Sequence, residues 1–411
     1  MEYSPAIIHA KQLLLLLGIV LGTGTFAGFI AKLIKVPDVV LFLLAGILLG
    51  SAALGWVNIP VDSTVNQLLL IFGSCYILFD GGASIKLSVL RNVWPTLVAI
   101  STVGVLITAA ITGLAAQEFL GLPWIIALLL GSTIASTDPA TLVPVFRQVK
   151  IRAKVAQTVM SESAFNDAMG AILTFTVLGI AIGHGSFSAS DNLIGFLKQS
   201  LIGLVGGLVL GYLTVVFIAH EKYRFLAEYA PAVTLMSVAA AYLSVDRLNA
   251  SGFMAVFTFG IMLGNKELFG FKMAQGEEDK LEDFILTTSL IMRMFIFILL
   301  GSQVNFSLLQ QHFWSALAVV AVFMLVARPM AVFACALPDH RAKWTWQELA
   351  FMCWTRETGV IPGALAGMLV GMKAPYADVI ASVTFMAILI TIILQATTTR
   401  WLADQLKLLE N

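Results

Sequence analysis

The chain has 411 residues, of which 59% are hydrophobic and only 12% are charged, and its mean hydropathy is +0.92. This apolar content exceeds what a soluble protein of this length needs, so it predicts an all-α polytopic membrane protein. The formal net charge is zero, which favours neither nucleic acid nor an acidic partner.

The hydropathy pattern divides the chain into thirteen apolar segments that we expect to be transmembrane helices. They are residues 10–31, 37–55, 64–83, 92–118, 123–146, 154–183, 192–219, 227–244, 249–265, 281–302, 310–336, 346–372 and 378–402. The first segment lacks a clear signal-peptide cleavage site, so we interpret it as a retained helix. No stretch between segments is long enough for a soluble domain, which predicts a single transmembrane domain over residues 1–411.

Basic residues concentrate in the loops that follow odd-numbered segments. These are Lys32, Lys35, Lys86, Arg91, Arg147, Lys150, Arg152, Lys154, Lys222, Arg224, Lys266, Lys272, Lys280, Arg341, Lys343, Arg400 and Lys407. The loops after even-numbered segments carry little beyond Arg247 and Lys373. Positive loops stay on the cytoplasmic side. We therefore expect a cytoplasmic C-terminus and an outside N-terminus, in the cell (inner) membrane.

The odd number of segments predicts two inverted six-helix repeats, residues 10–183 and 227–402, joined by a linker helix at 192–219. The fifth segment of each repeat is interrupted by polar residues and proline, at Thr137-Asp138-Pro139 and at 355–363. Interruptions at corresponding positions indicate crossed, broken helices and a binding site near the middle of the membrane.

The first interruption and the next segment together offer oxygen ligands for a cation. Asp138 precedes Pro139, which disfavours helix at Asp138 and predicts free carbonyl groups beside Thr137. Ser163 and Asp167 are four residues apart and share a helix face. We predict a Na⁺ site at Asp138, Asp167, Ser163 and Thr137. The alternatives are that Asp138 only caps a half-helix and that Asp167 belongs to a structural ion pair.

Three arginines lie in apolar segments and need partners there, namely Arg293, Arg328 and Arg356. Candidate partners are Glu162, Glu357 and the carbonyl groups of the broken helices. We interpret Glu162 as a structural residue rather than an ion ligand, and we favour the pair Glu162–Arg356.

Other polar residues give weaker signals. Asp80, near the end of the third segment, is a further candidate ion-binding residue: it lines the cytoplasmic approach of the ion or joins the ion through water. The alternative is an interfacial residue without contact to the ion. The cysteines and histidines lack metal-ligand spacing, and no phosphate-binding loop or nucleophile triad is present in the sequence. We therefore expect neither a cofactor nor an enzyme, only a monovalent cation and protons as transported substrates.

Several motifs occur in order along nearly the whole chain. They are Val36-Pro37, Gly46-Ile47-Leu48-Leu49-Gly50, Ile77-Leu78-Phe79-Asp80-Gly81-Gly82, Thr137-Asp138-Pro139, Glu162-Ser163 with Asn166-Asp167, Ala327-Arg328-Pro329 and the Arg356 segment. In these motifs the chain resembles the NhaP-like sodium/proton antiporters of the monovalent cation:proton antiporter superfamily.

The resemblance implies an antiporter that exchanges a monovalent cation, Na⁺ and also Li⁺, for H⁺. It assigns ion binding to Asp138, Thr137, Asp167 and Ser163, a steadying role to Asn166, and a structural ion pair to Glu162 and Arg356. Related electrogenic antiporters carry aspartate at the position of Asn166, so the resemblance implies electroneutral exchange. It also implies a homodimer in which segments 4–6 and 11–13 move against segments 1–3 and 8–10.

Two residues depart from the family pattern. The family usually has glutamate where Asp80 stands, and it commonly has Arg-Gly where this chain has Arg356-Glu357-Thr358-Gly359. Two rival functions use similar scaffolds: a sodium-coupled symporter for an organic anion, which needs a roomy cavity and substrate ligands, and a cation channel, which needs a continuous pore.

Overall fold

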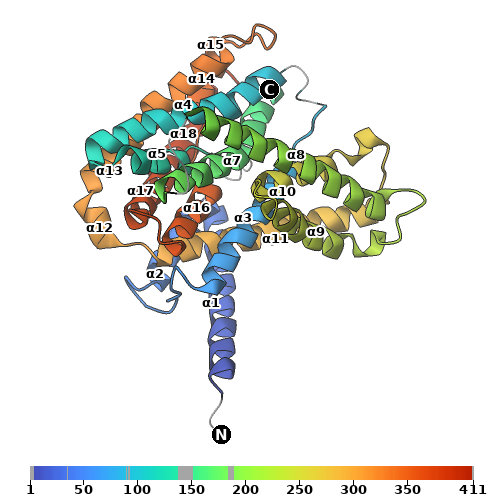
Figure 1. Ribbon diagram of the computed structural model, residues 1–411, viewed down its shortest axis with the longest axis horizontal. Coiled ribbons are helices and arrows are strands. Elements are labelled where there is room, and N and C mark those ends of the chain that lie inside the picture. The colour runs from blue at the N-terminus through green and yellow to red at the C-terminus, as the bar shows by residue number, and fades with distance from the viewer. Residues whose placement is uncertain are drawn as a thin grey trace.

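The computed structural model describes residues 4–34, 36–88, 90, 93–137, 151–183 and 189–409. Within these ranges the regular elements are helices, together with one isolated antiparallel bridge between Ile151 and Leu409. The all-helical class expected from the composition is therefore confirmed. Figure 1 shows the helices gathered into one body from which α1 (Pro5–Ile34) projects.

The remaining helices follow the expected apolar segments closely. They are α2 (Asp38–Leu49), α3 (Thr64–Ala83), α4 (Trp94–Leu120), α5 (Trp124–Thr133), α7 (Ala153–Ala181), α8 (Ala189–Ala219), α9 (Ala230–Asp246), α10 (Gly252–Gly264), α11 (Gln275–Ser302), α12 (Phe306–Gln311), α13 (Phe313–Val322), α14 (Arg328–Ala336), α15 (Trp346–Trp354), α16 (Val360–Gly371), α17 (Ala377–Thr391) and α18 (Thr397–Gln405). Eight of the described helical stretches are long and apolar enough to cross a bilayer, and α2, α5, α10 and α16 are shorter apolar helices.

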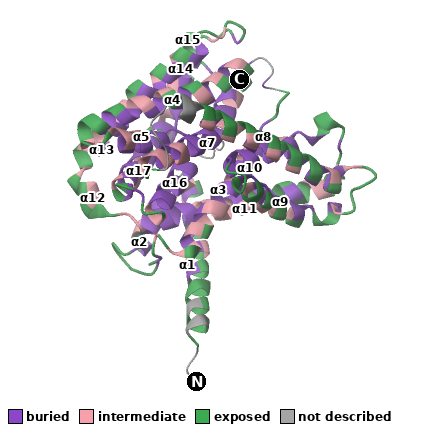
Figure 2. Ribbon diagram, in the orientation of Figure 1, coloured by how far each residue is buried: buried purple, intermediate pink, exposed green. Residues whose placement is uncertain are grey.

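Two groups of helices pack against each other. In the first group, α4 packs on α5, α7, α13 and α14, and α16 packs on α17. In the second, α10 packs on α3, α8 and α9, and α11 packs on α2 and α3. Helices α7 and α16 of the first group contact α3 of the second, so these two helices lie at the boundary. Figure 2 shows α7 and α16 largely buried, whereas α1 and much of α8 are exposed.

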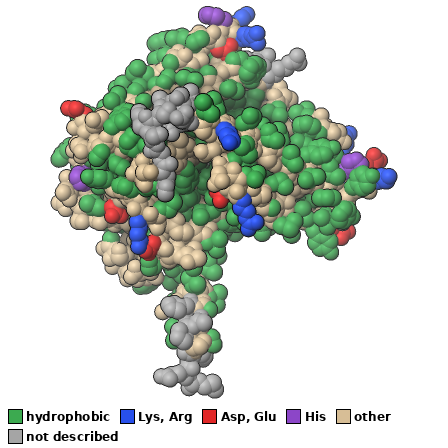
Figure 3. Space-filling view, viewed as in Figure 1, with side chains coloured by type: hydrophobic (Ala, Val, Ile, Leu, Met, Phe, Trp, Pro, Cys, Tyr) green, Lys and Arg blue, Asp and Glu red, His purple; other side chains and the backbone are tan. Residues whose placement is uncertain are grey.

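The outer surface is suited to lipid. In the view of Figure 3 hydrophobic side chains cover most of the face, and the few charged groups lie in small separate clusters. Lipid tails are as apolar as leucine, so helices in a membrane associate through close packing rather than through hydrophobic burial. Small residues provide that packing: a Cβ at Gly131 of α5 would collide with the carbonyl oxygen of Ala109 on α4.

Two polar interruptions appear where the sequence predicts them. Helix α5 ends at Thr133, and the chain leaves it through residues up to Thr137, beyond which residues 138–150 lie outside the described ranges. Helix α15 ends at Trp354 and α16 begins at Val360, with the non-helical stretch 355–359 between them. We call these the first break (134–137) and the second break (355–359).

Two π-helical segments lie in the helices on either side of the second break. Phe323–Ala327 precedes α14, and Ile392–Ala396 separates α17 from α18. Pro329 contributes to the first of them, because proline lacks the N–H that a regular turn would use. Such single π turns occur frequently at functional sites, and here one precedes Arg328 directly while the other contains Gln395.

Candidate functional site

The predicted ion ligands of the first break and α7 come together. The hydroxyl of Thr137 donates a hydrogen bond to Ser163 Oγ at 2.9 Å. Ser163 and Asp167 lie one helical turn apart on α7, and both are buried. Two hydroxyl oxygens are thus in contact, with a buried carboxylate one helical turn away on α7, and hydroxyl and carboxylate oxygens are the groups that hard cations prefer. Asp138 follows Thr137 directly but lies outside the described residues.

Asn166 fixes the position of the first break. Its Oδ1 accepts a hydrogen bond from the backbone N–H of Thr137 at 3.0 Å, and its Nδ2 donates to Thr137 Oγ1 at 2.9 Å. A backbone N–H released by a broken helix must find a partner when it is buried. The carboxamide supplies both a donor and an acceptor to one residue, which holds the Thr137 oxygen in place beside Ser163.

Close approach of α7 to the first break depends on Gly170, which the sequence reasoning did not single out. A Cβ at this position would lie 3.1 Å from the Cβ of Ser136, tighter than an ordinary contact. Any larger side chain would therefore push the break away from α7. The signal in the sequence was the small residue one turn after Asn166, on the same helix face.

Glu162 is paired with a buried arginine, but the partner is Arg328 and not Arg356 as expected. Arg328 Nη2 donates to Glu162 Oε2 at 2.9 Å, and Nη1 donates to Oε1, so the pair is bidentate. Arg328 Nε also donates to the carbonyl oxygen of Met352 at 2.9 Å, near the end of α15. Sequence spacing could not choose between the arginines, because it does not encode the direction in which each side chain points.

Arg356 has a different role from the one predicted. It donates from Nη1 to Thr108 Oγ1 at 3.0 Å and from Nη2 to the carbonyl oxygen of Ala135 in the first break. Its guanidinium carbon lies 4.9 Å from the centre of the Phe323 ring. A cation at the carboxyl end of a helix is favourable, because the last carbonyl groups carry partial negative charge. Arg356 therefore binds the end of α5 and does not pair with Glu162.

Arg293 and Asp80 lie at the boundary between the helix groups. Both are half-buried rather than fully buried, and Asp80 on α3 is within electrostatic reach of Ser289 and Arg293 on α11. A Cβ at Gly81, the next residue, would lie 3.4 Å from Ala164 Cβ. Asp80 is thus near the part of α7 that carries Ser163.

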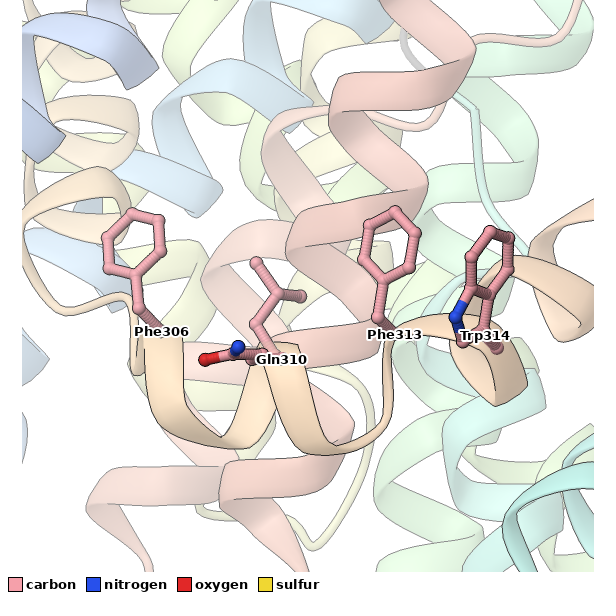
Figure 4. Close-up of a pocket in the computed structure, with 5 residues that line it drawn as sticks. Phe306, Gln310, Phe313 and Trp314 are labelled. Carbon is pink, nitrogen blue, oxygen red and sulfur yellow. The ribbon is translucent and has the colours of Figure 1, made fainter.

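A groove on the surface is separate from this site. It is lined by Phe306, Leu309, Gln310, Phe313 and Trp314. Figure 4 shows the aromatic side chains standing along α12 and the start of α13, at the edge of the molecule in Figure 1. None of the predicted ion ligands takes part in it.

A multi-pass helical body, two polar interruptions of apolar segments and a buried group of hydroxyl and carboxylate oxygens at one of them are the features of a secondary ion transporter. The sequence model of the family described as "Sodium/hydrogen exchanger, transmembrane" matches residues 15–405. The chain belongs to this family of cation/proton antiporters, which are secondary transporters and not enzymes. It is accordingly a multi-pass integral membrane protein.

Particular relatives extend along nearly the whole chain. The Na⁺/H⁺ antiporter 1 of Methanocaldococcus jannaschii is 32% identical over 95% of this chain and 95% of its own length. The K⁺/H⁺ antiporter NhaP of Alkalimonas amylolytica is 30% identical over 96% of this chain and 67% of its own length. The solved structure of the sodium proton antiporter MjNhaP1 at pH 8 superposes with a TM-score of 0.82 at 31% identity, covering 95% of this chain and 97% of that one. The resemblance to NhaP antiporters is confirmed.

Proposed function

We propose that the protein exchanges Na⁺, and also Li⁺, for H⁺ at the site formed by Asp138, Asp167, Ser163 and Thr137. The observation that carries the proposal is the hydrogen-bonded group of Thr137, Ser163 and Asn166 beside Asp167. Relatives include both Na⁺/H⁺ and K⁺/H⁺ antiporters, so the choice of Na⁺ is part of the proposal.

Cation and proton compete for the same carboxylates in this scheme. Burial favours the protonated form of a carboxylic acid, whereas a bound cation favours the ionised form. A site that holds either ligand is nearly neutral and can cross the membrane with its helix group. An empty, charged site crosses poorly because a buried charge is costly. That single condition couples the two fluxes.

The charges of the residues assigned to the first break support one-for-one, electroneutral exchange. Glu162 is neutralised by Arg328, so this pair adds no net charge to the site. Arg356 brings one positive charge to the first break, and Asp138 and Asp167 bring two negative charges. The remaining single negative charge is matched by one monovalent cation or by one proton. Asn166, an amide, adds no proton of its own.

The larger architecture completes the proposal. Residues 10–183 and 227–402 are two inverted repeats with the linker helix at 192–219, and each repeat contains one interrupted helix. Segments 4–6 and 11–13 move as a body against segments 1–3 and 8–10, which form the homodimer. The N-terminus lies outside and the C-terminus in the cytoplasm of a cell (inner) membrane, as the distribution of basic residues indicates. Asp80 lines the approach of the ion.

The experiment is exchange in proteoliposomes with each alkali cation in turn. We expect proton movement driven by Na⁺ or Li⁺ gradients without any organic solute, saturating with cation and unchanged when the membrane potential is clamped at different values. A requirement for an organic anion would indicate a symporter, and a flux that does not saturate would indicate a channel. A rate that follows the potential would contradict electroneutral exchange.

A further inference from the structure

Helices α3 and α16 meet at the boundary between the two helix groups. Helix α16 belongs to the group that moves in the proposed cycle, and α3 belongs to the group that stays fixed; the two helices pack against each other. In the proposed topology the first turn of α3 and the last turn of α16 both lie on the outer side of the membrane. Gly81, near the other end of α3, approaches Ala164 of α7, so α3 lies along the boundary over most of its length.

Gln67, in the first turn of α3, forms a hydrogen bond across this boundary. Its Nε2 donates to the carbonyl oxygen of Val61 at 2.8 Å and to the carbonyl oxygen of Gly367 on α16 at 3.3 Å. The shorter bond stays within the fixed group, and the longer, weaker bond joins that group to α16. The carboxamide is therefore anchored to the fixed group and reaches from there to the moving group.

Neighbouring amides hold the anchored side in place. Asn66 Nδ2 donates to the same carbonyl oxygen of Val61 at 2.8 Å. Gln303 Nε2, just after α11, donates to Asn66 Oδ1 at 3.0 Å. Asn66 has no exposed surface, and a buried carboxamide with both ends bonded keeps its orientation. These bonds do not involve α16, so a movement of α16 leaves them intact.

Gly371 makes the carbonyl group of Gly367 reachable from α3. A side chain on a helix covers the turn that precedes it, and residue 371 lies one turn after residue 367. A Cβ at Gly371 would overlap the carboxamide of Gln67, and a Cβ at Gly367 would lie 2.7 Å from Leu70 Cδ1. Because both positions lack a side chain, α16 comes close enough to α3 for Gln67 to bind its backbone.

A second contact joins the same two places at the surface. Lys373, just after α16, has its Nζ 3.6 Å from Oδ2 of Asp62, in the loop before α3. Both side chains are largely exposed, so the pair contributes little by itself. The loop before α3 and the end of α16 are thus joined at two points, with the Gln67 bond as the inner one.

We propose that Gln67 is the outer-gate residue of the exchange cycle. While its bond to Gly367 is formed, α16 is held against α3 and the ion site is closed to the outside. When α16 moves with its group, this bond breaks, the carboxamide stays on Val61, and the site opens to the outside. A neutral hydrogen bond is weak enough to break in every cycle, yet its loss shifts a two-state equilibrium about 5-fold. The inference rests on the proposed function, because it takes the two helix groups to move against each other during exchange.

The test measures how often the outer side opens, through the reaction of one introduced cysteine with a membrane-impermeant maleimide. Leu70 is 3% exposed, packs on Gly367 and lies one turn deeper than Gln67, so Leu70→Cys reacts from the outer side only when the gate is open. The native cysteines are first replaced by alanine, namely Cys75, Cys335 and Cys353. In right-side-out vesicles we expect Gln67→Met, which keeps the side-chain length but removes the donor, to raise the labelling rate about 5-fold.

Gly371→Ala tests the same bond from the side of α16, because its methyl group displaces the carboxamide of Gln67. It should raise labelling by a similar factor, and combining it with Gln67→Met should add nothing further. Gln117→Met, at an exposed position near the outer end of α4, is the matched control and should label at the rate of the parent protein. An unchanged rate in Gln67→Met would overturn the inference, and Gly371→Ala decides in the same way if Gln67→Met does not fold.

Exchange kinetics separate a gate residue from a merely structural one. A gate changes the populations of the two states and leaves the ion site as it was. In Gln67→Met the half-saturating Na⁺ concentration should therefore fall about 5-fold at the outer face and should not fall at the cytoplasmic face. Equal falls at both faces would contradict the gate. If the wild-type protein shows no Na⁺-driven exchange, the proposed function fails, while the labelling rates still decide the role of Gln67.

Discussion

Both breaks are bound by a buried arginine, but the two arginines differ in whether a carboxylate neutralises them. A carbonyl oxygen near the end of each preceding half-helix accepts a hydrogen bond from a buried arginine: Ala135 from Arg356, and Met352 from Arg328. Arg328 is also neutralised by Glu162. Among the described residues no carboxylate lies within ion-pair distance of Arg356. A buried arginine can thus be either part of the scaffold or part of the charge balance of the ion site.

This difference explains why the two acidic residues of α7 have separate roles. Glu162 forms a bidentate pair at the boundary with α14 and α15, whereas Asp167 lies one turn beyond Ser163 beside the first break. An ion pair that is fully satisfied costs more to disturb than it contributes in net stability. The Glu162–Arg328 pair therefore suits a structural role, and Asp167 is the acidic residue of α7 that remains to exchange a cation for a proton.

The largest effect is expected from separating the scaffold pair. Glu162→Gln leaves the Arg328 charge buried without its counter-charge, which should lower stability by about 3–5 kcal/mol. The double variant Glu162→Leu with Arg328→Met removes both charges and should recover most of that loss. Thermal unfolding of the purified proteins measures both. A double variant as unstable as the single one would contradict a purely structural pair.

A smaller effect should distinguish the side chains that hold the two breaks. Asn166→Ala leaves the Thr137 N–H and hydroxyl without their partner, and we expect the Na⁺ concentration for half-maximal exchange to rise about 10-fold, or about 1.4 kcal/mol. Thr391→Ala removes only the acceptor of the Thr358 N–H, and we expect a rise of about 3-fold. Exchange rates across a series of Na⁺ concentrations give both values. Equal effects would contradict the leading role of the first break.

The smallest effect concerns a loop remote from both breaks. Partial burial raises the pKa of Asp339, but hydrogen bonds from Thr96 and from the backbone N–H groups of Ala342 and Arg341 outweigh it and hold the pKa below 3.8. Ionised Asp339 therefore stabilises the fold above its unfolded-state pKa, and this contribution is lost as the pH falls through the lower, folded-state pKa.

Asp339→Asn should lower the apparent melting temperature by about 1–2 °C at neutral pH. The difference from wild type should shrink at acidic pH, as the pH falls through the lowered folded-state pKa of Asp339 and the wild-type carboxyl group takes up its proton. Unfolding scans at a series of pH values measure this. Na⁺/H⁺ exchange should stay at the wild-type rate, and a loss of exchange would show that this loop is coupled to the breaks.

Much of the fold could be predicted because each apolar segment carries its own signal. Within the described residues each of the predicted segments contains a helix, although the second helix ends at Leu49. Both breaks occur where polar residues and proline or glycine interrupt an apolar run. Within the site, helical spacing placed Ser163 on the face of Asp167, and the resemblance to the family assigned Thr137 and Asn166 to the same site; hydrogen bonds join Thr137, Ser163 and Asn166.

The partners of the arginines could not be predicted in the same way. Their choice depends on side-chain direction and on tertiary contacts, which periodicity does not encode. Gln67 was missed for a similar reason: one amide in an apolar segment gives no signal until the structure shows that it donates to Gly367 on another helix. The role of Gly170 could be recognised only from its close approach to Ser136 in the structure.

The central claim is that Asp167 carries the exchange, and the most direct measurement is Na⁺-driven proton movement in proteoliposomes containing Asp167→Asn. Asp246→Asn, an exposed aspartate at the end of α9, is the matched control. We predict that Asp167→Asn reconstitutes normally but moves no protons in response to a Na⁺ gradient, while Asp246→Asn retains the wild-type rate. Exchange by Asp167→Asn at the wild-type rate would contradict the account.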